Sequence, residues 1–520
     1  MTSSYINNEN LNNLDAIVIG SGIGGLVTAS QLSKKGAKVL VLERYKIPGG
    51  SGGSFKRKGY TFDVGASMIF GFGTNGHTNL LTRALSDVNQ SCETIPDPVQ
   101  LAYHLPENLE ITVDRNYEKF IGVLTDIFPK EKLGIRKFYD ACWRVFNCLD
   151  AMPLLSIEDP SYLAKVFFKA PFACLGLARW LPINAGEVAR KYIKDPILLK
   201  FIDIECFCWS VMPADRTPMI NAGMVFSDRH AGGINYPKGG VGIIAEKLVK
   251  GLIANGGNIL YKSNVTNILI KDNKAYGVEL ENKKRIYAKK IISNATRWDT
   301  FGGESKEHPL VSKEFVPSSE KAWRNRYKPS SSFLSIHLGV EENLIPKGSH
   351  CHHLIVNNWE RMEAEQGVIF ISIPTLLDPS LSPEGTHIVH AFTPSSIKGW
   401  EDLSASQYRD KKKNDSEKLI YNINKLFPGI KDAINHLEIG SPKTHARFLN
   451  RHLGTYGPIP SKKLSGLLRM PMNSTRIKNL FCVGDSSFPG QGLNAVAFSG
   501  YACAHKIGSQ LNINKWELPE

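Results

Sequence analysis

A glycine-rich turn near the N-terminus constrains the fold of this 520-residue chain more than any other feature of its sequence. Residues 15–20 read DAIVIG, an apolar and β-branched run that is typical of a buried parallel strand. The turn that follows carries Gly20, Gly22, Gly24 and Gly25. A helix is expected from the turn to Gly36, a residue suited to a left-handed helix end, and a second strand at 37–42. This order of elements predicts a Rossmann-type unit.

Each glycine of the G-x-G-x-x-G spacing has its own physical task. Gly20 permits the tight turn, Gly22 lets the backbone approach a pyrophosphate, and Gly25 lets the helix pack closely on the strand. The N-terminus of the helix offers unpaired N–H groups to the phosphates. Glu43 follows the second strand, 23 residues after Gly20, where it can accept hydrogen bonds from a ribose. We therefore expect a dinucleotide at this turn.

A second segment, at 479–500, distinguishes FAD from NAD. It reads as a strand that ends at Gly484 and Asp485, followed by a glycine turn that opens a helix. The N-terminus of that helix is suited to face the N1/O2 edge of a flavin, and Asp485 to bind the ribityl chain or, through water, the pyrophosphate. Later glycine runs lack the flanking strand and acid, so NAD(P)H is expected only as an indirect electron donor.

These motifs resemble the amine oxidase and phytoene desaturase superfamily of flavoproteins. The likeness rests on the E-R-x-x-x-P-G-G stretch at 43–50 and on the Y-P-K-G-G block at 236–240. The late G-D-S-S-F-P-G-Q-G-L-N-A-V-A-F-S-G block, at 484–500, is similar to the carotenoid cis–trans isomerase branch. The resemblance extends from about residue 15 to about residue 507.

The resemblance implies a set of cofactor contacts, including a backbone contact from Val265 to the adenine. The residues expected to bind FAD are Gly20, Gly22, Gly24, Gly25, Glu43, Arg44, Gly49, Gly50, Ser51, Val265, Gly484, Asp485, Gly492, Leu493 and Asn494. The catalytic side chains stay unknown, because the flavin itself is expected to perform the chemistry. No metal is expected.

The implied activity is the redox-neutral conversion of poly-cis-lycopene to all-trans-lycopene by a reduced FAD, which needs an external electron donor. A transiently donated electron or proton would lower the bond order at the cis double bonds and allow rotation. Three alternatives stay open: a carotene desaturase, a saturase, and a non-enzymatic prenyl-protein chaperone related to the GDP-dissociation inhibitors. The intact glycine motif and the late Gly484–Asp485 block argue against the chaperone.

The expected fold class is α/β, with a discontinuous FAD-binding domain and an interleaved, mixed α+β substrate domain. A strand meander at 259–295 returns the chain to the nucleotide unit. The FAD-binding domain is expected to comprise 14–75, 236–300 and 476–512. The substrate domain is expected at 76–235 and 301–475, after a flexible N-terminus at 1–13.

The basic charge fits a plain solvated surface or a membrane face, and the sequence argues against nucleic-acid binding and a spanning helix. The net charge is +14, but the cations are spread along the chain and accompany no nucleic-acid motif. No apolar run reaches the length of a spanning helix. Residues 162–181 mix aromatic and aliphatic side chains with Lys and Arg, as an interfacial segment does. With no recognisable signal or transit peptide, we expect peripheral membrane attachment on the cytoplasmic side.

Several reactive side chains are interpreted as structural. Residues 350–353 read HCHH, and adjacent strand residues point to opposite faces, which argues against one metal site. Cys206 and Cys208, on one face of an expected strand, are interpreted as buried packing. Solvated or salt-bridged roles are expected for Asp203, Glu205, Asp215 and Arg216, and no nucleophilic role for Ser486 or Ser487. Aromatic residues of 76–235 form either plain core or the wall of a polyene tunnel.

Overall fold

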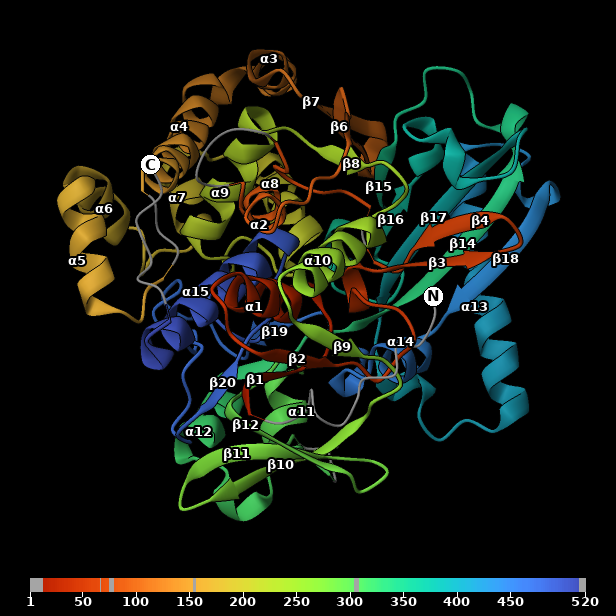
Figure 1. The fold of residues 1–520 in the computed structure, drawn as a ribbon. Coiled ribbons are helices and arrows are strands. Elements are labelled where there is room, and N and C mark those ends of the chain that lie inside the picture. Colours follow the sequence, from red (N-terminus) through yellow and green to blue (C-terminus); the bar gives the residue numbers. More distant parts are fainter. Residues whose placement is uncertain (1–12, 66, 74–78, 153–155, 304–307, 514–520) are drawn as a thin grey trace.

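The computed structural model describes residues 13–65, 67–73, 79–152, 156–303 and 308–513. Two large sheets lie side by side, and a group of helices covers one end of the molecule, in the upper left of Figure 1. The flexible N-terminus expected at 1–13 falls, except for residue 13, outside the described residues.

The first sheet is built around the glycine turn. Its strands are β1 (Leu14–Ile19), β2 (Val39–Leu42), β9 (Asn258–Leu260), β10 (Val265–Lys271), β11 (Lys274–Leu280), β12 (Arg285–Ser293) and β20 (Leu480–Cys482). Strands β20, β12, β1, β2 and β9 are parallel neighbours in that order. β11 pairs antiparallel with the first part of β12, and β10 with β11, so the expected meander is confirmed.

Alternation along β1 explains why both faces of this sheet are covered. Ala16 and Val18 pack against a helical layer formed by α1 (Ile23–Lys34) and α15 (Leu493–Leu511). Ile17 and Ile19 face the opposite core, which includes side chains of β10 and β11. The helix α10 (Gly242–Ala254) packs beside α1, and α2 (Leu80–Ser86) contacts both α10 and α15.

The second sheet runs in the order β18-β14-β17-β16-β15-β6-β7. Its strands are β6 (Val99–Leu105), β7 (Leu109–Asp114), β14 (Ser332–Glu341), β15 (His352–Val356), β16 (Val368–Ser372), β17 (Thr386–Ser395) and β18 (Ile434–Gly440). One face of β14, including Leu334 and Ile336, packs on α13 (Ala405–Leu426). The other face, which carries Phe333, Ser335 and His337, is turned toward the interior of the molecule.

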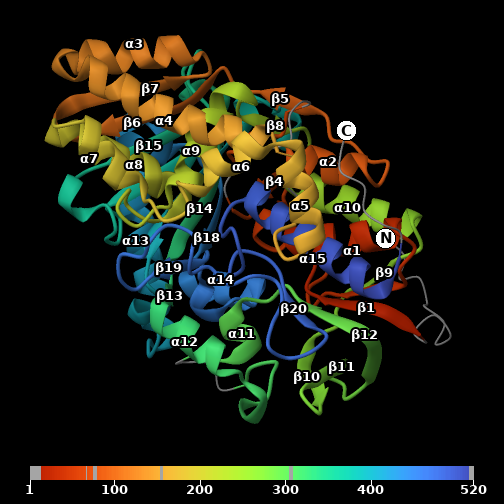
Figure 2. The same cartoon turned by 90° about the vertical axis from the view of Figure 1, so that its left-hand side faces the viewer.

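The helical group follows β7 in the chain and closes the interior space from the side. It consists of α3 (Tyr117–Ile127), α4 (Lys132–Asp150), α5 (Pro160–Lys169), α6 (Pro171–Ala178), α7 (Ala185–Tyr192), α8 (Pro196–Ser210) and α9 (Met219–Ala231). Figure 2 brings α5 and α6 to the front of this group. Both helices are short, and the angle between them is 110°.

The remaining elements connect the two sheets. They are α11 (Arg297–Phe301), α12 (Ser318–Arg326), α14 (Pro442–Leu449) and the two-stranded ladders β3–β4 (Ser54–Arg57, Tyr60–Asp63), β5–β8 (Thr94–Pro96, Asn235–Pro237) and β13–β19 (Tyr327–Pro329, Pro458–Pro460). The β5–β8 ladder joins segments about 140 residues apart, as expected for interleaved units.

The fold class predicted from the sequence is confirmed: a Rossmann-type α/β unit is interleaved with a mixed α+β part. One local prediction is wrong. Cys206 and Cys208 lie on the helix α8, not on a strand. This helix is buried on most sides, so its apolar residues show no helical period in the sequence. Cys206 is buried in the core, as expected, whereas Cys208 reaches the interior cavity.

Candidate flavin and substrate cavity

A single cavity of about 1790 Å³ extends between the two sheets and the helical group. All residues expected to bind the cofactor line it except Gly25. The elements that contribute them are the turn after β1, the segment after β2, the start of β10, and the segment from β20 to α15. The structure therefore brings together residues that are more than 470 positions apart in the sequence.

The geometry of the glycine turn agrees with the tasks assigned to Gly20 and Gly25. Gly20 has a φ of +92°, a left-handed conformation that other residues rarely adopt. A Cβ on Gly25 would lie 2.6 Å from the backbone oxygen of Gly20, so this glycine serves the close contact between helix and strand. A Cβ on Gly22 would first meet the side-chain amide of Asn294, at 2.6 Å.

Asn294 is a site residue that the sequence analysis did not identify. It follows β12 directly, and its side chain lies next to the positions where Gly22, Gly24 and Gly484 would carry a Cβ. It also lines the cavity. The available signal was the Ser-Asn-Ala end of the returning strand, which places an amide at the carboxyl edge of a parallel sheet, where ligands bind.

Glu43 is held against the glycine turn by three hydrogen bonds. Its Oε2 accepts from the backbone N–H of Ser21 at 2.8 Å and from the hydroxyl of Ser21 at 2.6 Å. Its Oε1 accepts from the backbone N–H of Tyr45 at 2.6 Å. Oε1 accepts only one of these bonds and retains acceptor capacity for a further donor. Glu43 thus fixes the shape of the turn and presents an acceptor to the cavity.

Arg44 and Asp485 both have protein partners in α14 or directly after it. Arg44 donates to the backbone oxygens of Arg447 and Phe448, near the C-terminal end of α14. Asp485 forms an ion pair with Arg451, which also lines the cavity. Sequence reasoning could not find these contacts, because the partners belong to a segment assigned to the other domain.

Ser51 and the first turn of α15 each offer a polar atom without a protein partner. The hydroxyl of Ser51 and the Oδ1 of Asn494 are buried, and neither has a hydrogen-bond partner. The Nδ2 of Asn494 donates to the backbone oxygen of Phe70 at 2.9 Å, which fixes the amide orientation. α15 begins after Gly492, whose φ is +103°, and its first residues line the cavity. Because an unpaired buried polar atom is destabilising, these two atoms are suited to hydrogen-bond the polar edge of a bound flavin ring.

The part of the cavity away from the glycine turn is apolar. Its wall includes Leu149, Met152, Leu163, Val166, Leu177, Ile220, Val225, Phe333, Phe370 and Phe392. Of the aromatic residues weighed as tunnel wall or core, Trp209 lines the cavity, whereas Phe201 and Phe207 are plain core. Apolar lining of this kind suits a hydrocarbon ligand.

Exposed aromatic residues mark the outer side of α5 and α6. Phe168 and Phe172 are 81% and 88% exposed, and Leu175 is 61% exposed. The inner side of the same helices, through Leu163 and Leu177, lines the apolar part of the cavity. Among the described residues, no single helix has the length and apolar character to cross a membrane, although this bent pair passes the same test when taken together.

Histidines interrupt the apolar wall on the second sheet. The rings of His337 and His390 stack with their centroids 4.2 Å apart, and both residues line the cavity. Burial lowers the pKa of His337 to about 4 and the pKa of His390 well below its ordinary value. His445 joins Ser335 and Tyr456 by hydrogen bonds of 3.2 and 3.1 Å. These imidazoles are therefore neutral near pH 7.

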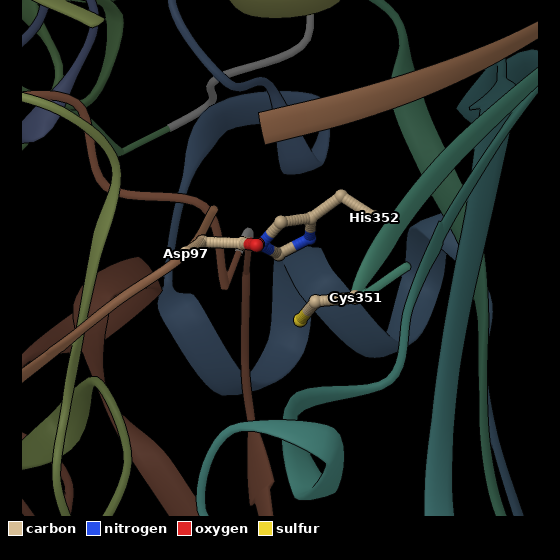
Figure 3. Close-up of side chains that lie close together, drawn as sticks. All are labelled: Asp97, Cys351 and His352. Carbon is tan, nitrogen blue, oxygen red and sulfur yellow. The ribbon is translucent and has the colours of Figure 1, made fainter. Parts of the chain in front are cut away.

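Three reactive side chains converge behind this wall, as Figure 3 shows. Asp97, from the loop before β6, faces the ring of His352, and the thiol of Cys351 lies beside them. Their oxygen, nitrogen and sulfur atoms all lie within 4.8 Å of one another. Adjacent residues within a strand point to opposite faces, but Cys351 precedes β15, so Cys351 and His352 both turn toward one acid. Burial raises the pKa of Asp97 to about 7.

The other discounted side chains have structural partners. Glu205 is fully buried and forms a two-pronged ion pair with Arg229, at 2.7 and 3.0 Å, so the salt-bridged interpretation is confirmed. Asp215 and Arg216 pair with Arg190 and Glu363, and Asp203 accepts from a backbone N–H. The hydroxyls of Ser486 and Ser487 bond to backbone groups.

Comparison with known proteins agrees with this geometry. Residues 18–85 match the family model of the NAD(P)-binding Rossmann-like domain. The chain is 55% identical to prolycopene isomerase 1, chloroplastic, of an Oncidium hybrid cultivar, over 98% of this chain and 86% of that protein. It is 52% identical to prolycopene isomerase, chloroplastic, of Arabidopsis thaliana, over 96% of this chain and 84% of that protein. The chain belongs to the prolycopene isomerase family.

Solved structures show the same fold at low sequence identity. An oxidoreductase from Methanosarcina mazei covers 96% of this chain and is itself covered completely, with a TM-score of 0.63 and 20% identity. The Rossmann-type unit together with the family indicates a flavin as the cofactor.

Proposed function

We propose that the chain is an FAD-dependent isomerase that converts poly-cis-lycopene to all-trans-lycopene without net oxidation or reduction. One observation carries this proposal: the glycine turn and a long apolar space open into the same cavity. A dinucleotide bound at the turn would extend its reactive ring toward a hydrocarbon held in the apolar part. Membership of the prolycopene isomerase family supports the same reaction.

The residues present fit FAD along its whole length. The pyrophosphate would lie at the N-terminus of α1, with the ribose hydroxyls on Glu43 and the adenine at Val265. The buried Ser51 hydroxyl and Asn494 Oδ1 would accept hydrogen bonds from an N–H group of the flavin ring. The N1/O2 edge of the ring, which is negatively charged when the flavin is reduced, would face the N-terminus of α15. The remaining contacts would come from Gly20, Gly22, Gly24, Arg44, Gly49, Gly50, Gly484, Asp485, Gly492 and Leu493.

We further propose that this cofactor-binding domain comprises 14–75, 236–300 and 476–512, and the substrate domain 76–235 and 301–475. Residues 66, 74 and 75 of the cofactor domain lie outside the described ones, as do residues 76–78, 153–155 and 304–307 of the substrate domain. The paired strands of the first sheet come from all three parts of the cofactor domain, which supports the division.

The mechanism requires little acid–base chemistry from the chain, because a polyene has no leaving group. A bound, reduced flavin would supply the electron or proton that lowers the bond order of a cis double bond. The apolar wall holds the polyene in an extended form beside the ring. Phe333, Phe370 and Phe392 exclude water from that side, so a charged transient species meets no solvent proton.

The reduced state of FAD implies an electron donor. NAD(P)H is proposed only as an indirect donor, because the sequence contains no second nucleotide-binding motif in which a strand and an acidic residue flank a glycine turn.

We propose peripheral attachment to a membrane, on the cytoplasmic side, through α5 and α6. Phe168 and Phe172 would enter the lipid surface, with Lys165, Lys169 and Arg179 near the headgroups. The inner faces of the same helices line the apolar part of the cavity, so a carotenoid could pass from the bilayer without meeting water.

The decisive experiment distinguishes an isomerase from a desaturase of the same fold. Poly-cis-lycopene in liposomes is incubated with the protein, without oxygen, after the flavin is reduced with dithionite. All-trans-lycopene of unchanged mass is expected. A need for an oxidant, together with loss of two hydrogens per turnover from a less unsaturated carotene, would instead assign the chain as a desaturase.

A further inference from the structure

A row of polar side chains crosses the second sheet on the face that carries the cavity wall. Neighbouring strands pair His352 with Ser372, Ser372 with His390, and His390 with His337. Residues paired in an antiparallel sheet point to the same face, with their Cβ atoms about 4.5–5.5 Å apart. Asp97 stands beyond the His352 end, and its Oδ2 is 3.8 Å from the Nε2 of His352. We call these five residues the polar row.

The polar row is buried from end to end. Asp97 is 2% exposed, Ser372 is 6% exposed, and each of the three histidines is 4% exposed or less. Only its His390–His337 end reaches the flavin and substrate cavity. The row thus joins a buried acid to the wall of that cavity, through the strands β15, β16 and β17.

Two links of the polar row lack a hydrogen bond: the one between Asp97 and His352, and the one between Ser372 and His390. The Nδ1 of His352 is hydrogen-bonded to the hydroxyl of Ser372 at 2.9 Å. By contrast, Asp97 Oδ2, His352 Nε2 and both ring nitrogens of His390 are buried without a partner. A buried polar atom that is never paired destabilises the folded state. Small rotations that close the two gaps would pair these atoms.

The geometry points to a proton relay that carries one proton between Asp97 and the cavity wall at His390. This inference rests on the proposed flavin function, since reduction of a flavin by two electrons takes up at least one proton. The external two-electron donor supplies the electrons, and the polar row supplies the proton to a site that excludes water.

The transfer balances group by group. Asp97 gives its proton to Nε2 of His352, whose Nδ1–H passes to the hydroxyl of Ser372. The hydroxyl proton passes to one nitrogen of His390, and the proton on the other nitrogen enters the cavity. Each histidine ends neutral with its tautomer exchanged, and Asp97 ends as a carboxylate. Reoxidation of the flavin returns the proton along the same path.

The charges around Asp97 suit a proton store near neutral pH. Burial raises the pKa of Asp97 to about 7, and the Arg115 guanidinium opposes that rise. His352 and Cys351 face the carboxyl from β15 and its preceding residue, and burial keeps both neutral: it lowers the pKa of His352 to about 4 and raises that of the thiol well above its ordinary value. Asp97 therefore holds its proton in slightly acidic solution and loses it in basic solution.

The test follows reduction of the FAD-loaded protein by dithionite in an anaerobic stopped-flow instrument, from pH 6 to pH 8. For wild type, the rate should fall by about tenfold over this range as an acid of pKa about 7 loses its proton. Asp97→Asn should slow reduction at pH 6 by about tenfold or more and remove the pH dependence. Ser372→Ala, which removes one hydroxyl from the middle of the row, should slow it to the same extent.

His387→Gln is the matched control, because it lies on β17 three residues before His390 and on the opposite face. It should behave as wild type. Flavin content and unfolding temperature of each variant show that it is folded, and Ser372→Ala keeps the test valid if Asp97→Asn does not fold.

Wild-type rates and pH profiles in both Asp97→Asn and Ser372→Ala would overturn the relay. A stoichiometric divalent metal in the purified protein that is lost in Asp97→Asn would also overturn it, because a metal would hold Asp97 as a carboxylate. Wild-type protein that binds no FAD or converts no carotenoid would refute the proposed function instead. The two failures are therefore separable.

Discussion

Replacement of Glu43 by Gln should weaken FAD binding while leaving the fold intact. The Glu43 carboxylate accepts from the N–H and hydroxyl of Ser21 at 2.8 and 2.6 Å and from the N–H of Tyr45 at 2.6 Å. A glutamine of the same shape has one acceptor oxygen, so its NH₂ group must face the donors on one side. The glycine turn then loses at least one charge-assisted hydrogen bond.

The size of the effect follows from that lost bond. A hydrogen bond to a charged group contributes about 1.5–3 kcal/mol, so the dissociation constant for FAD should rise by about 10- to 150-fold. Loss of the acceptor offered to the ribose acts in the same direction. Glu43 is half-buried and lies outside the main core clusters, so the unfolding temperature of the apoprotein should change little.

The assay titrates apoprotein with FAD and follows the flavin fluorescence. Glu438→Gln is the matched control. Glu438 also lines the cavity, but its ion-pair partner is Arg57, at 3.8 Å, and not a residue of the glycine turn. It should bind FAD as wild type does. An unchanged dissociation constant for Glu43→Gln would refute the role assigned to this carboxylate, whereas a large fall in unfolding temperature would assign it to the fold.

Three further predictions address the turn, the membrane and the buried acid. Gly25→Val places a Cβ 2.6 Å from the backbone oxygen of Gly20 and should lower the unfolding free energy, measured by urea titration, by about 1–3 kcal/mol or more. In Gly22→Ala the new Cβ lies against the flexible side-chain amide of Asn294, so flavin content should fall more than stability. Phe168→Ser combined with Phe172→Ser should reduce flotation with anionic liposomes at low salt without loss of FAD; unchanged flotation would exclude this docking surface. The pKa of Asp97 is raised to about 7 in the folded state, so the folded state binds more protons than the unfolded state and the unfolding free energy should fall as the pH rises from about 4 to about 7. Urea titrations of Asp97→Asn should lack this pH dependence.

The cofactor unit was predictable because its contacts are local. The turn, helix and acid from Gly20 to Glu43 form one supersecondary unit whose residue types are fixed by backbone geometry and phosphate chemistry. The meander and the late segment at 479–500 carry equally local turn and strand signals. The prediction for Cys206 was wrong because its helix is buried on most sides and its apolar residues show no helical period. Asp195 before Pro196 was an available signal for the start of this helix.

The rest of the site depends on contacts between distant segments. Asn294 lies among the glycines only because the second part of the nucleotide unit folds beside the first. Arg451 reaches Asp485 only because a segment assigned to the substrate domain folds beside the third part. The polar row depends on the register of four strands, and a shift by one residue would send its side chains to the other face. No local pattern in the sequence encodes that register, so His390 could not be recognised from its neighbours.

The count of product molecules per reduced flavin tests the central claim most directly. Protein reduced once with a measured amount of dithionite, then freed of excess reductant, is mixed anaerobically with poly-cis-lycopene in liposomes. A redox-neutral reaction at this cavity predicts many all-trans molecules per flavin, while the absorption of the reduced flavin persists. Product formation that stops at one molecule per flavin, with the oxidised flavin spectrum restored, would contradict the account.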